Sequence, residues 1–191
     1  MFAQVESGSI TSFPKGNKGI QIGDNNYPRT IYTLWTEAER NAIGIYTVEI
    51  DETNRKDETF YINTDISYAF GSGKVTGSYG TATAKAIADA NAKDENGDDL
   101  DPVIVIKGLK TQYKNQFNLQ AAGLLAPTDW YVVKATEVSD YSVPSAITTY
   151  RAAVRTKVNA METAIDGCAN VEALITLLEY TTDSDGVTSR P

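Results

Sequence analysis

One acidic segment has the alternation of side chains that could bind a calcium ion. Asp94, Asn96 and Asp98 stand at every second position, as the first ligands of an EF-hand loop do. Such a loop also needs a glycine directly after the third ligand and a glutamate at the twelfth position. This chain has Asp99 and Val105 at those two places. We therefore interpret the segment as a solvated acidic loop, with an adventitious cation site as the alternative.

A second segment, Gly71–Lys74, contains the Gly-Lys pair of a phosphate-binding loop. That loop requires another glycine five residues before the pair and a Ser or Thr after the lysine, to hold magnesium. Tyr68 and Val75 occupy these positions, so both requirements fail. The turn of a β-hairpin explains the glycines better.

The composition removes most catalytic chemistry. The chain has no histidine and a single cysteine, Cys168. Catalysis by Ser-His-Asp or Cys-His groups and the usual catalytic zinc sites are therefore excluded. Pairs of carboxylates could still act as acid and base, but among 25 acidic residues no spacing singles out a pair. The sequence predicts a protein that is not an enzyme, with no catalytic residue, no metal ligand and no cofactor.

Charge and hydropathy exclude further classes of partner. The 191 residues carry 17 basic and 25 acidic side chains, a net charge of −8. Because affinity for a phosphate backbone comes from clustered Lys and Arg, we expect no nucleic-acid partner. No apolar run approaches the ~20 residues of a membrane span, and residues 1–6 do not resemble a secretory signal. We expect no membrane partner and, with one cysteine, no internal disulfide.

Residues 1–80 have the pattern of a β-rich module. Phe2–Val5 and Ile10–Phe13 flank a glycine turn and predict a hairpin, as do Ser67–Phe70 and Lys74–Tyr79. The aromatic and β-branched residues at 31–35 fit the same strand-rich pattern. The next strand is Ile45–Ile50, and we expect Thr59–Asn63 to return beside it after a charged turn.

A short helix interrupts these strands. Thr36 and Glu39 have the spacing of a capping box, in which each side chain bonds the other residue's backbone N–H. The helix of about two turns that follows should stop at Gly44, a residue suited to the left-handed position after a helix.

The second half of the chain changes to helical periodicity. We interpret residues 81–102 as an acidic, Ala-rich linker with a short helix. A helical module at 103–180 follows, and 181–191 form a polar tail. One apolar stripe predicts a helix over 106–124 that ends before Pro127, and a second predicts a helix from Pro144 to Gly167. Trp130–Val133 between them is expected to be extended, and Asn170 to cap a last helix through Leu178.

The fold class predicted is therefore α+β, with a β-rich N-terminal module and a helix hairpin in the C-terminal one. The two stripes can pack against each other. The 3,4,4,3,4 spacing of the second stripe is also close to a heptad, which leaves oligomerisation open.

The C-terminal module contains a pattern known from phage proteins. Leu124–Trp130 and, twenty residues later, Tyr150–Arg155 resemble the C-terminal module of tail-fibre-assembly-like proteins of tailed phages, whose pattern runs "LLxxTDW" and then "WxxYRxxLR". The chain departs from this pattern at Ile147, where the family usually has its second tryptophan.

Segments of the N-terminal half are similar to small virion proteins encoded near the tail genes of marine phages. They are Val5–Ile10, Tyr27–Pro28 and Leu34–Tyr46. Together, the resembling segments in the two halves comprise 34 of the 191 residues. The resemblance implies a virion protein that is made in the cytoplasm of a host bacterium, with other virion proteins as partners.

The residues of the C-terminal pattern also have a physical interpretation. Thr128 or Asp129 can satisfy free amides where the chain restarts after Pro127, while Trp130 supplies a large apolar plug. On the next helix, Tyr150 and Val154 share the buried face. The arginines one turn apart on an adjoining face can pair with Asp129 or with a partner's acidic groups; they are Arg151 and Arg155.

Aromatic residues offer a second set of contact candidates. The chain has 11 tyrosines and two tryptophans, Trp35 and Trp130. Tyr and Trp are enriched at interfaces and can stack on sugar rings, although ordinary packing in strands and cores is the alternative.

From these observations we predict a non-catalytic structural component of a bacteriophage virion, in the tail, fibre or baseplate region. It would act by protein–protein assembly and form a homo-oligomer. One alternative is a tail-fibre assembly chaperone that is absent from the finished particle. Another is a receptor- or glycan-binding module.

Overall fold

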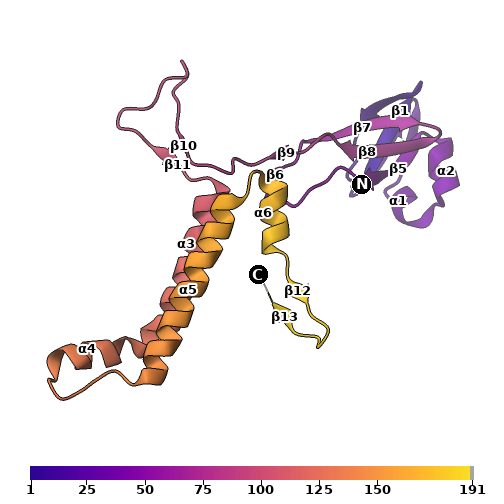
Figure 1. The fold of residues 1–191 in the computed structure, drawn as a ribbon. Coiled ribbons are helices and arrows are strands. Elements are labelled where there is room, and N and C mark those ends of the chain that lie inside the picture. Colours follow the sequence, from indigo (N-terminus) through magenta and orange to yellow (C-terminus); the bar gives the residue numbers. More distant parts are fainter. Residues whose placement is uncertain (190–191) are drawn as a thin grey trace. The chain divides into compact units, whose positions relative to one another are not determined.

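The computed structural model describes residues 1–189. They divide into two compact units, one formed by residues 1–83 and the other starting at Ala84. Strands dominate the first unit and helices the second, so the chain is α+β, as predicted. Figure 1 shows both units, which are described separately below.

The first unit is built on a five-stranded sheet with the order β2-β1-β5-β8-β7. Its strands are β1 (Phe2–Glu6), β2 (Ser9–Ser12), β5 (Ile45–Asp51), β7 (Ile66–Gly71) and β8 (Lys74–Tyr79). All neighbours are antiparallel except β5 and β8, which are parallel. Both hairpins expected from the sequence, β1–β2 and β7–β8, are present.

Alternation along these strands buries one face of the sheet. Ala3, Val5, Val48 and Val75 form its core, with partly buried aromatic residues packed around them. Phe13, just after β2, contacts Tyr68 of β7 with ring centroids 4.7 Å apart. The two edge strands therefore approach each other, and the sheet curls around its core.

Two short helices lie beside this sheet. They are α1 (Ile31–Leu34) and α2 (Glu37–Ala42), preceded by a small hairpin of β3 (Ile20–Ile22) and β4 (Asn25–Tyr27). The capping box is confirmed, because the Glu39 N–H bonds the Thr36 hydroxyl and the Thr36 N–H bonds the Glu39 carboxylate. Gly44 has the expected left-handed conformation, with φ of +81°.

Two expectations for this unit were wrong. Residues 31–34 form a helical turn instead of a strand, because Ile31 and Tyr32 are buried together against Ile45. The segment 59–63 does not return beside β5, whose two neighbours are β1 and β8. Only β6 (Tyr61–Ile62) is extended there, and it pairs with β9 (Thr83–Ala84).

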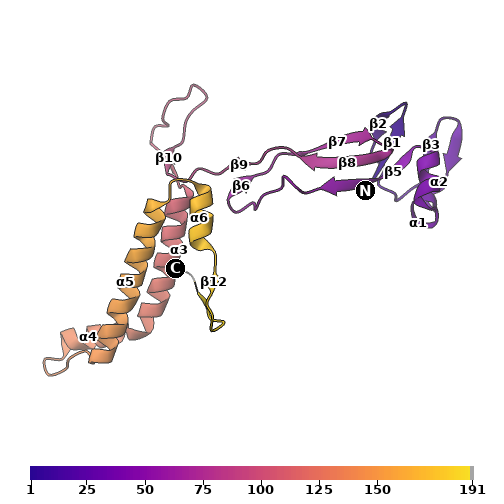
Figure 2. The ribbon, with the colours of Figure 1, turned by 45° about the vertical axis from the view of Figure 1, so that its right-hand side comes forward.

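The second unit is dominated by two long antiparallel helices, which lie side by side in both Figure 1 and Figure 2. Its elements are β10 (Ala90–Asn91), β11 (Val105–Ile106), α3 (Leu109–Leu125), the 3-10 turn η1 (Ala126–Thr128), α4 (Asp129–Glu137), α5 (Ser145–Gly167), α6 (Val171–Leu178), β12 (Thr181–Thr182) and β13 (Thr188–Ser189). The predicted helix hairpin and last helix are confirmed. The Asn170 side chain caps α6 by accepting the Ala173 N–H.

Three local predictions failed in this unit. The segment expected to hold a short helix contains β10, which pairs with β11. Ile106 therefore belongs to a strand, and the first long helix begins only at Leu109. Trp130–Val133 is helical within α4, since η1 turns the chain after Pro127 and lets a new helix start at once.

Residues 181–189 of the expected polar tail form the hairpin β12–β13, and Arg190 and Pro191 lie outside the described residues.

The N-terminus of α3 is capped by a segment about twenty residues earlier in the chain. Leu109 and Lys110 donate their backbone N–H groups to the carbonyls of Ala86 and Ile87, at 3.0 Å each. The Gly108 N–H donates to the Asp89 carboxylate at 2.8 Å. Because the first N–H groups of a helix have no partner within it, segment 86–89 supplies the acceptors that α3 lacks.

Asp89 should make part of the stability of this unit dependent on pH. Hydrogen bonds from the Thr111 side chain and the Gly108 backbone, with Lys107 nearby, lower the pKa of the Asp89 carboxyl below its ordinary value of 3.8. A lowered pKa in the folded state stabilises the fold above about pH 3.8, and this contribution disappears as the pH falls through the folded-state value. We expect Asp89→Asn to be less stable than wild type at neutral pH and to approach it in acid. Urea unfolding followed by circular dichroism across this pH range measures the difference, and a constant gap at all pH values would contradict the assignment.

Candidate protein-protein interface on the helical unit

The helix hairpin has a small core, and its two flanks differ in polarity. Its buried side chains include Leu109 and Ala121 of α3 and Met161 and Ile165 of α5. One flank is polar. Lys114 pairs with Asp166 at 2.8 Å, and this contact raises the pKa of the lysine. Asn118 bonds Glu162 at 2.6 Å on the same flank. These contacts connect the two helices without covering the apolar side of the hairpin.

That apolar side contains an open groove of about 600 Å³. Leu124 of α3 and Tyr150 and Val154 of α5 contribute to its wall, and the only charged residue among those that line it is Lys157. Leu124 is 55% exposed and Tyr150 41% exposed. The Tyr150 hydroxyl donates to the Leu124 carbonyl at 3.2 Å, which fixes the ring across the groove. The full lining is Phe117, Gln120, Ala121, Leu124, Tyr150, Ala153, Val154, Lys157, Val158, Met161, Tyr180, Thr188 and Ser189.

Arg151 holds the corner between α3 and α4 against α5. Its side chain is buried, and the residue is only 8% exposed. One guanidinium nitrogen, Nη1, lies 3.1 Å from the Leu125 carbonyl, 2.6 Å from the Thr128 hydroxyl and 2.7 Å from the Asp129 carboxylate. The Thr128 hydroxyl also donates to the Leu125 carbonyl at 2.7 Å. Of the two alternatives for the arginines of this helix, the ion pair with Asp129 is therefore present for Arg151.

Several other roles expected around this corner are not observed. Thr128 and Asp129 do not cap α4, because their side chains are engaged with Leu125 and Arg151. Trp130 is not a buried plug: it is 52% exposed, and α4 has no buried residue. Arg151 lies inside the corner instead of on an adjoining face, whereas Arg155 is exposed and forms no ion pair with any residue of 1–189. Tyr150 lines the groove and is not buried.

Three aromatic residues lie near Lys134 of α4: Trp130 is exposed, and Tyr131 and Tyr141 are half-buried. The ring of Trp130 packs on Tyr131 with centroids 4.2 Å apart. The Lys134 ammonium lies 5.5 Å from the Trp130 centroid and 4.3 Å from that of Tyr141. These cation–π contacts hold the aromatic rings in a fixed arrangement at the surface.

Trp35, the other tryptophan candidate, has a packing role in the first unit. It lies between α1 and α2 and packs against the cluster of Ile31, Tyr32 and Ile45. Its carbonyl accepts a hydrogen bond from Arg40 at 2.5 Å. Trp35 is therefore not part of the groove on the helical unit.

The acidic segment forms a turn that uses its own carboxylates. Asp94 accepts the backbone N–H groups of Asn96 and Asp98 at 2.8 and 3.0 Å. These hydrogen bonds lower the pKa of its carboxyl. Asp99 pairs with Lys93 at 2.5 Å. No group of three or more His, Cys, Asp or Glu residues that could hold a metal ion occurs among the described residues.

The Gly71–Lys74 segment is the turn of the β7–β8 hairpin, as predicted. Ser72 and Gly73 both have positive φ, at 52° and 74°. This is the geometry of a tight two-residue hairpin turn. Lys74 extends from β8 to Glu49 of β5 at 3.3 Å.

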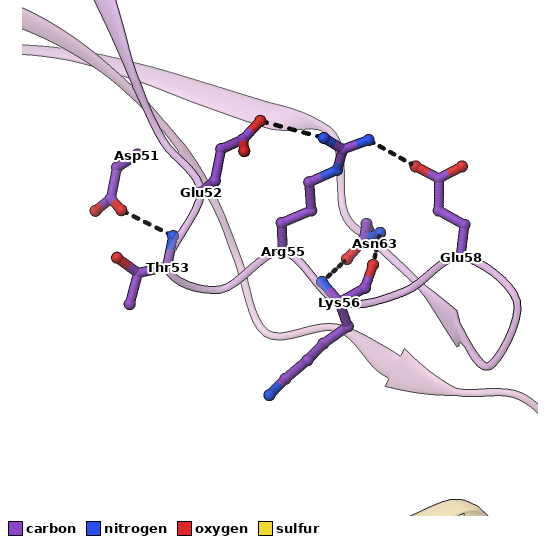
Figure 3. Close-up of polar contacts among 7 residues, drawn as sticks. All are labelled: Asp51, Glu52, Thr53, Arg55, Lys56, Glu58 and Asn63. Carbon is purple, nitrogen blue, oxygen red and sulfur yellow. Dashed lines mark hydrogen bonds and ion pairs between the residues drawn. The ribbon is translucent and has the colours of Figure 1, made fainter. Parts of the chain in front are cut away.

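In a charged loop of the first unit, the side chains pair with groups of the same part of the chain. Figure 3 shows Arg55 between Glu52 and Glu58, at 3.1 and 3.4 Å. The Asn63 side chain bonds both the N–H and the carbonyl of Lys56, at 2.8 and 2.9 Å. The Arg55 guanidinium is therefore already paired with two carboxylates of the same loop.

Within residues 1–189, no helix has both the length and the apolar character needed to cross a membrane.

Comparison with protein-family models, curated proteins and solved structures found no match to this chain.

The sequence indicated part of this site. The pattern around Leu124–Trp130 and Tyr150–Arg155 pointed to the two segments that meet at the corner. The apolar stripes of the two long helices did not predict the groove, because their side chains fill only part of the space between α3 and α5. The end that carries Leu124 and Tyr150 is left open, and no local signal marks where packing between two helices stops.

Proposed function

We propose that this chain is a non-catalytic structural component of a bacteriophage particle, in the tail, fibre or baseplate region. It acts by protein–protein assembly. The observation that carries the proposal is the open apolar groove on the helical unit, bounded by Leu124 and Tyr150. Exposed apolar surface with a polar margin is typical of protein contact sites.

The resemblance to phage proteins supports the same role. The two segments that carry it are held together by Arg151, next to the groove. They contribute Leu124 at one side of the groove and Tyr150 and Val154 at the other. A rigid corner of this kind presents a surface of constant shape, which lowers the entropy lost on binding.

Mass spectrometry of purified particles tests the proposal directly. Particles of the phage that encodes the chain should contain it at stoichiometric copy number. If the chain is abundant in the lysate but absent from particles, the structural role is wrong and the tail-fibre assembly chaperone replaces it.

A matched pair of leucine variants tests the groove itself. Both Leu124 and Leu119 belong to α3 and are exposed, at 55% and 75%, but only Leu124 lines the groove. We expect Leu124→Glu to lower incorporation into particles about tenfold, because a charge would lose its water on contact with an apolar partner. Leu119→Glu should be incorporated like wild type. Equal incorporation of both variants would show that the groove is not the contact surface.

The aromatic cluster on α4 favours one further candidate, a receptor- or glycan-binding module. Trp130 presents an exposed ring beside Tyr131 and Lys134, and sugar rings stack on such surfaces. Binding to a glycan array that is lost in Trp130→Ala and kept in Leu119→Glu would establish this role. An array without bound glycans would exclude it for the sugars presented.

A further inference from the structure

The second unit also exposes four consecutive aliphatic residues, the last two of which form β11. Val103, Ile104, Val105 and Ile106 are 58, 54, 46 and 58% exposed. No other run of four large apolar residues is exposed in the described part of the chain. A contiguous apolar stretch in an acidic chain is unfavourable in water, which suggests that it is covered in the working protein.

The backbone of this segment has one free edge. It pairs with β10 on the other side, where Ala90 lies opposite Ile106 and the Ala92 N–H donates to the Ile104 carbonyl at 2.7 Å. Successive backbone groups of a strand point to opposite edges. The N–H and carbonyl groups of Val105 therefore point away from β10, toward an edge at which no strand of residues 1–189 pairs. The Ala92–Ile104 hydrogen bond continues this alternation by one residue, and its extension to Val103 directs the backbone groups of Val103 to the same edge.

We propose that this edge binds the same edge of a second copy of the chain. The two segments would lie antiparallel about a two-fold axis at Ile104, so that Val103 of one copy exchanges backbone hydrogen bonds with Val105 of the other. The two β10–β11 hairpins would then form one four-stranded sheet. Addition of a strand to an exposed edge is an established mode of recognition.

Charge complementarity selects a second copy in the antiparallel direction. Asp101 and Lys107 stand at opposite ends of the apolar run, three residues from Ile104 on each side. In the proposed register, each Asp101 lies opposite the Lys107 of the other copy, whereas a parallel pairing would bring like charges together. Lys107 is 3.5 Å from Asp89 in its own chain, but its side chain is 56% exposed and accessible to a partner.

This inference rests on the proposed assembly role and names one partner for it. The edge is built from residues 103–106, and none of them lines the groove. Self-association and incorporation into particles can therefore be measured separately.

Sedimentation velocity of the full chain over a concentration series tests the proposal. Wild type should form a dimer, and Val103→Lys with Val105→Lys should remain monomeric with unchanged circular dichroism. Both side chains are exposed in the monomer, so their replacement leaves its packing intact. The matched control is Ile62→Lys, an exposed strand residue of the first unit at 60%, which should dimerise like wild type. A wild-type chain that stays monomeric would overturn the inference and leave the particle experiment unaffected.

Two further measurements test the register. Asp101→Lys and Lys107→Asp should each weaken the dimer about tenfold, and the double exchange should restore it. In a Cys168→Ala background, Ile104→Cys should form an intermolecular disulfide faster than Val103→Cys, because only position 104 meets itself across the axis. Failure of the double exchange to restore the dimer, or faster cross-linking at 103, would refute this antiparallel register.

Discussion

Arg151→Ala is expected to lower the free energy of unfolding of the helical unit by about 2–3 kcal/mol. The substitution removes the single nitrogen that bonds the Leu125 carbonyl, the Thr128 hydroxyl and the Asp129 carboxylate. Asp129 remains in water, because its side chain is 58% exposed, and it contributes little to the loss. Most of the effect comes from the part-buried hydrogen bonds and from the packing of the arginine stem.

Arg155→Ala is the matched control for this prediction. Arg155 lies one turn further along α5, is exposed, and pairs with no carboxylate of the described residues. Its replacement should change the free energy of unfolding by less than about 0.5 kcal/mol. Arg151→Lys should fall between the two, since the lysine keeps the apolar stem but is too short to place its ammonium at the position of Nη1. Urea unfolding monitored by helical circular dichroism measures all three variants. Equal losses for Arg151→Ala and Arg155→Ala would mean that the corner does not depend on Arg151.

Local features were predictable from the sequence when neighbouring residues decide them. The capping box at Thr36 and Glu39, the cap at Asn170 and the turn before Lys74 each depend on a few adjacent residues. In each of these cases, the chemistry of the local residues is the main determinant. The pairing of Arg151 with Asp129 was one of two alternatives that the sequence left open, and the helix hairpin brings the two positions together.

The features that sequence reasoning missed depend on contacts between distant segments. Ile31 and Tyr32 have the side chains of a strand, but burial against Ile45 selects a helical turn. Ile106 fits the apolar stripe of the first helix, yet pairing with Ala90 makes it part of a strand. Periodicity cannot resolve such cases, since an apolar residue satisfies either structure and tertiary contacts decide.

Gly108→Ala is expected to destabilise the helical unit by about 3 kcal/mol. A Cβ at this position would lie 2.3 Å from both the carbonyl carbon and the carbonyl oxygen of Ala88 and 2.7 Å from the Ile87 oxygen. All three atoms belong to the backbone of the segment that caps α3, so no side chain can rotate to make room. Relief of the clash has to move segment 86–89 away from the helix, which also breaks the hydrogen bonds to Leu109 and Lys110.

Gly123→Ala provides a control of opposite sign, because a Cβ at this position in α3 would meet open space. It should stabilise the unit by up to about 1 kcal/mol, since alanine has the higher helix propensity. Both variants can be compared in the same urea titration. Hydrogen exchange at Leu109 and Lys110 then identifies the cause, because only Gly108→Ala should expose these amides. If their protection survived in that variant, the cap would tolerate a side chain at 108, and the close approach of segment 86–89 to α3 would not be what holds the start of the helix.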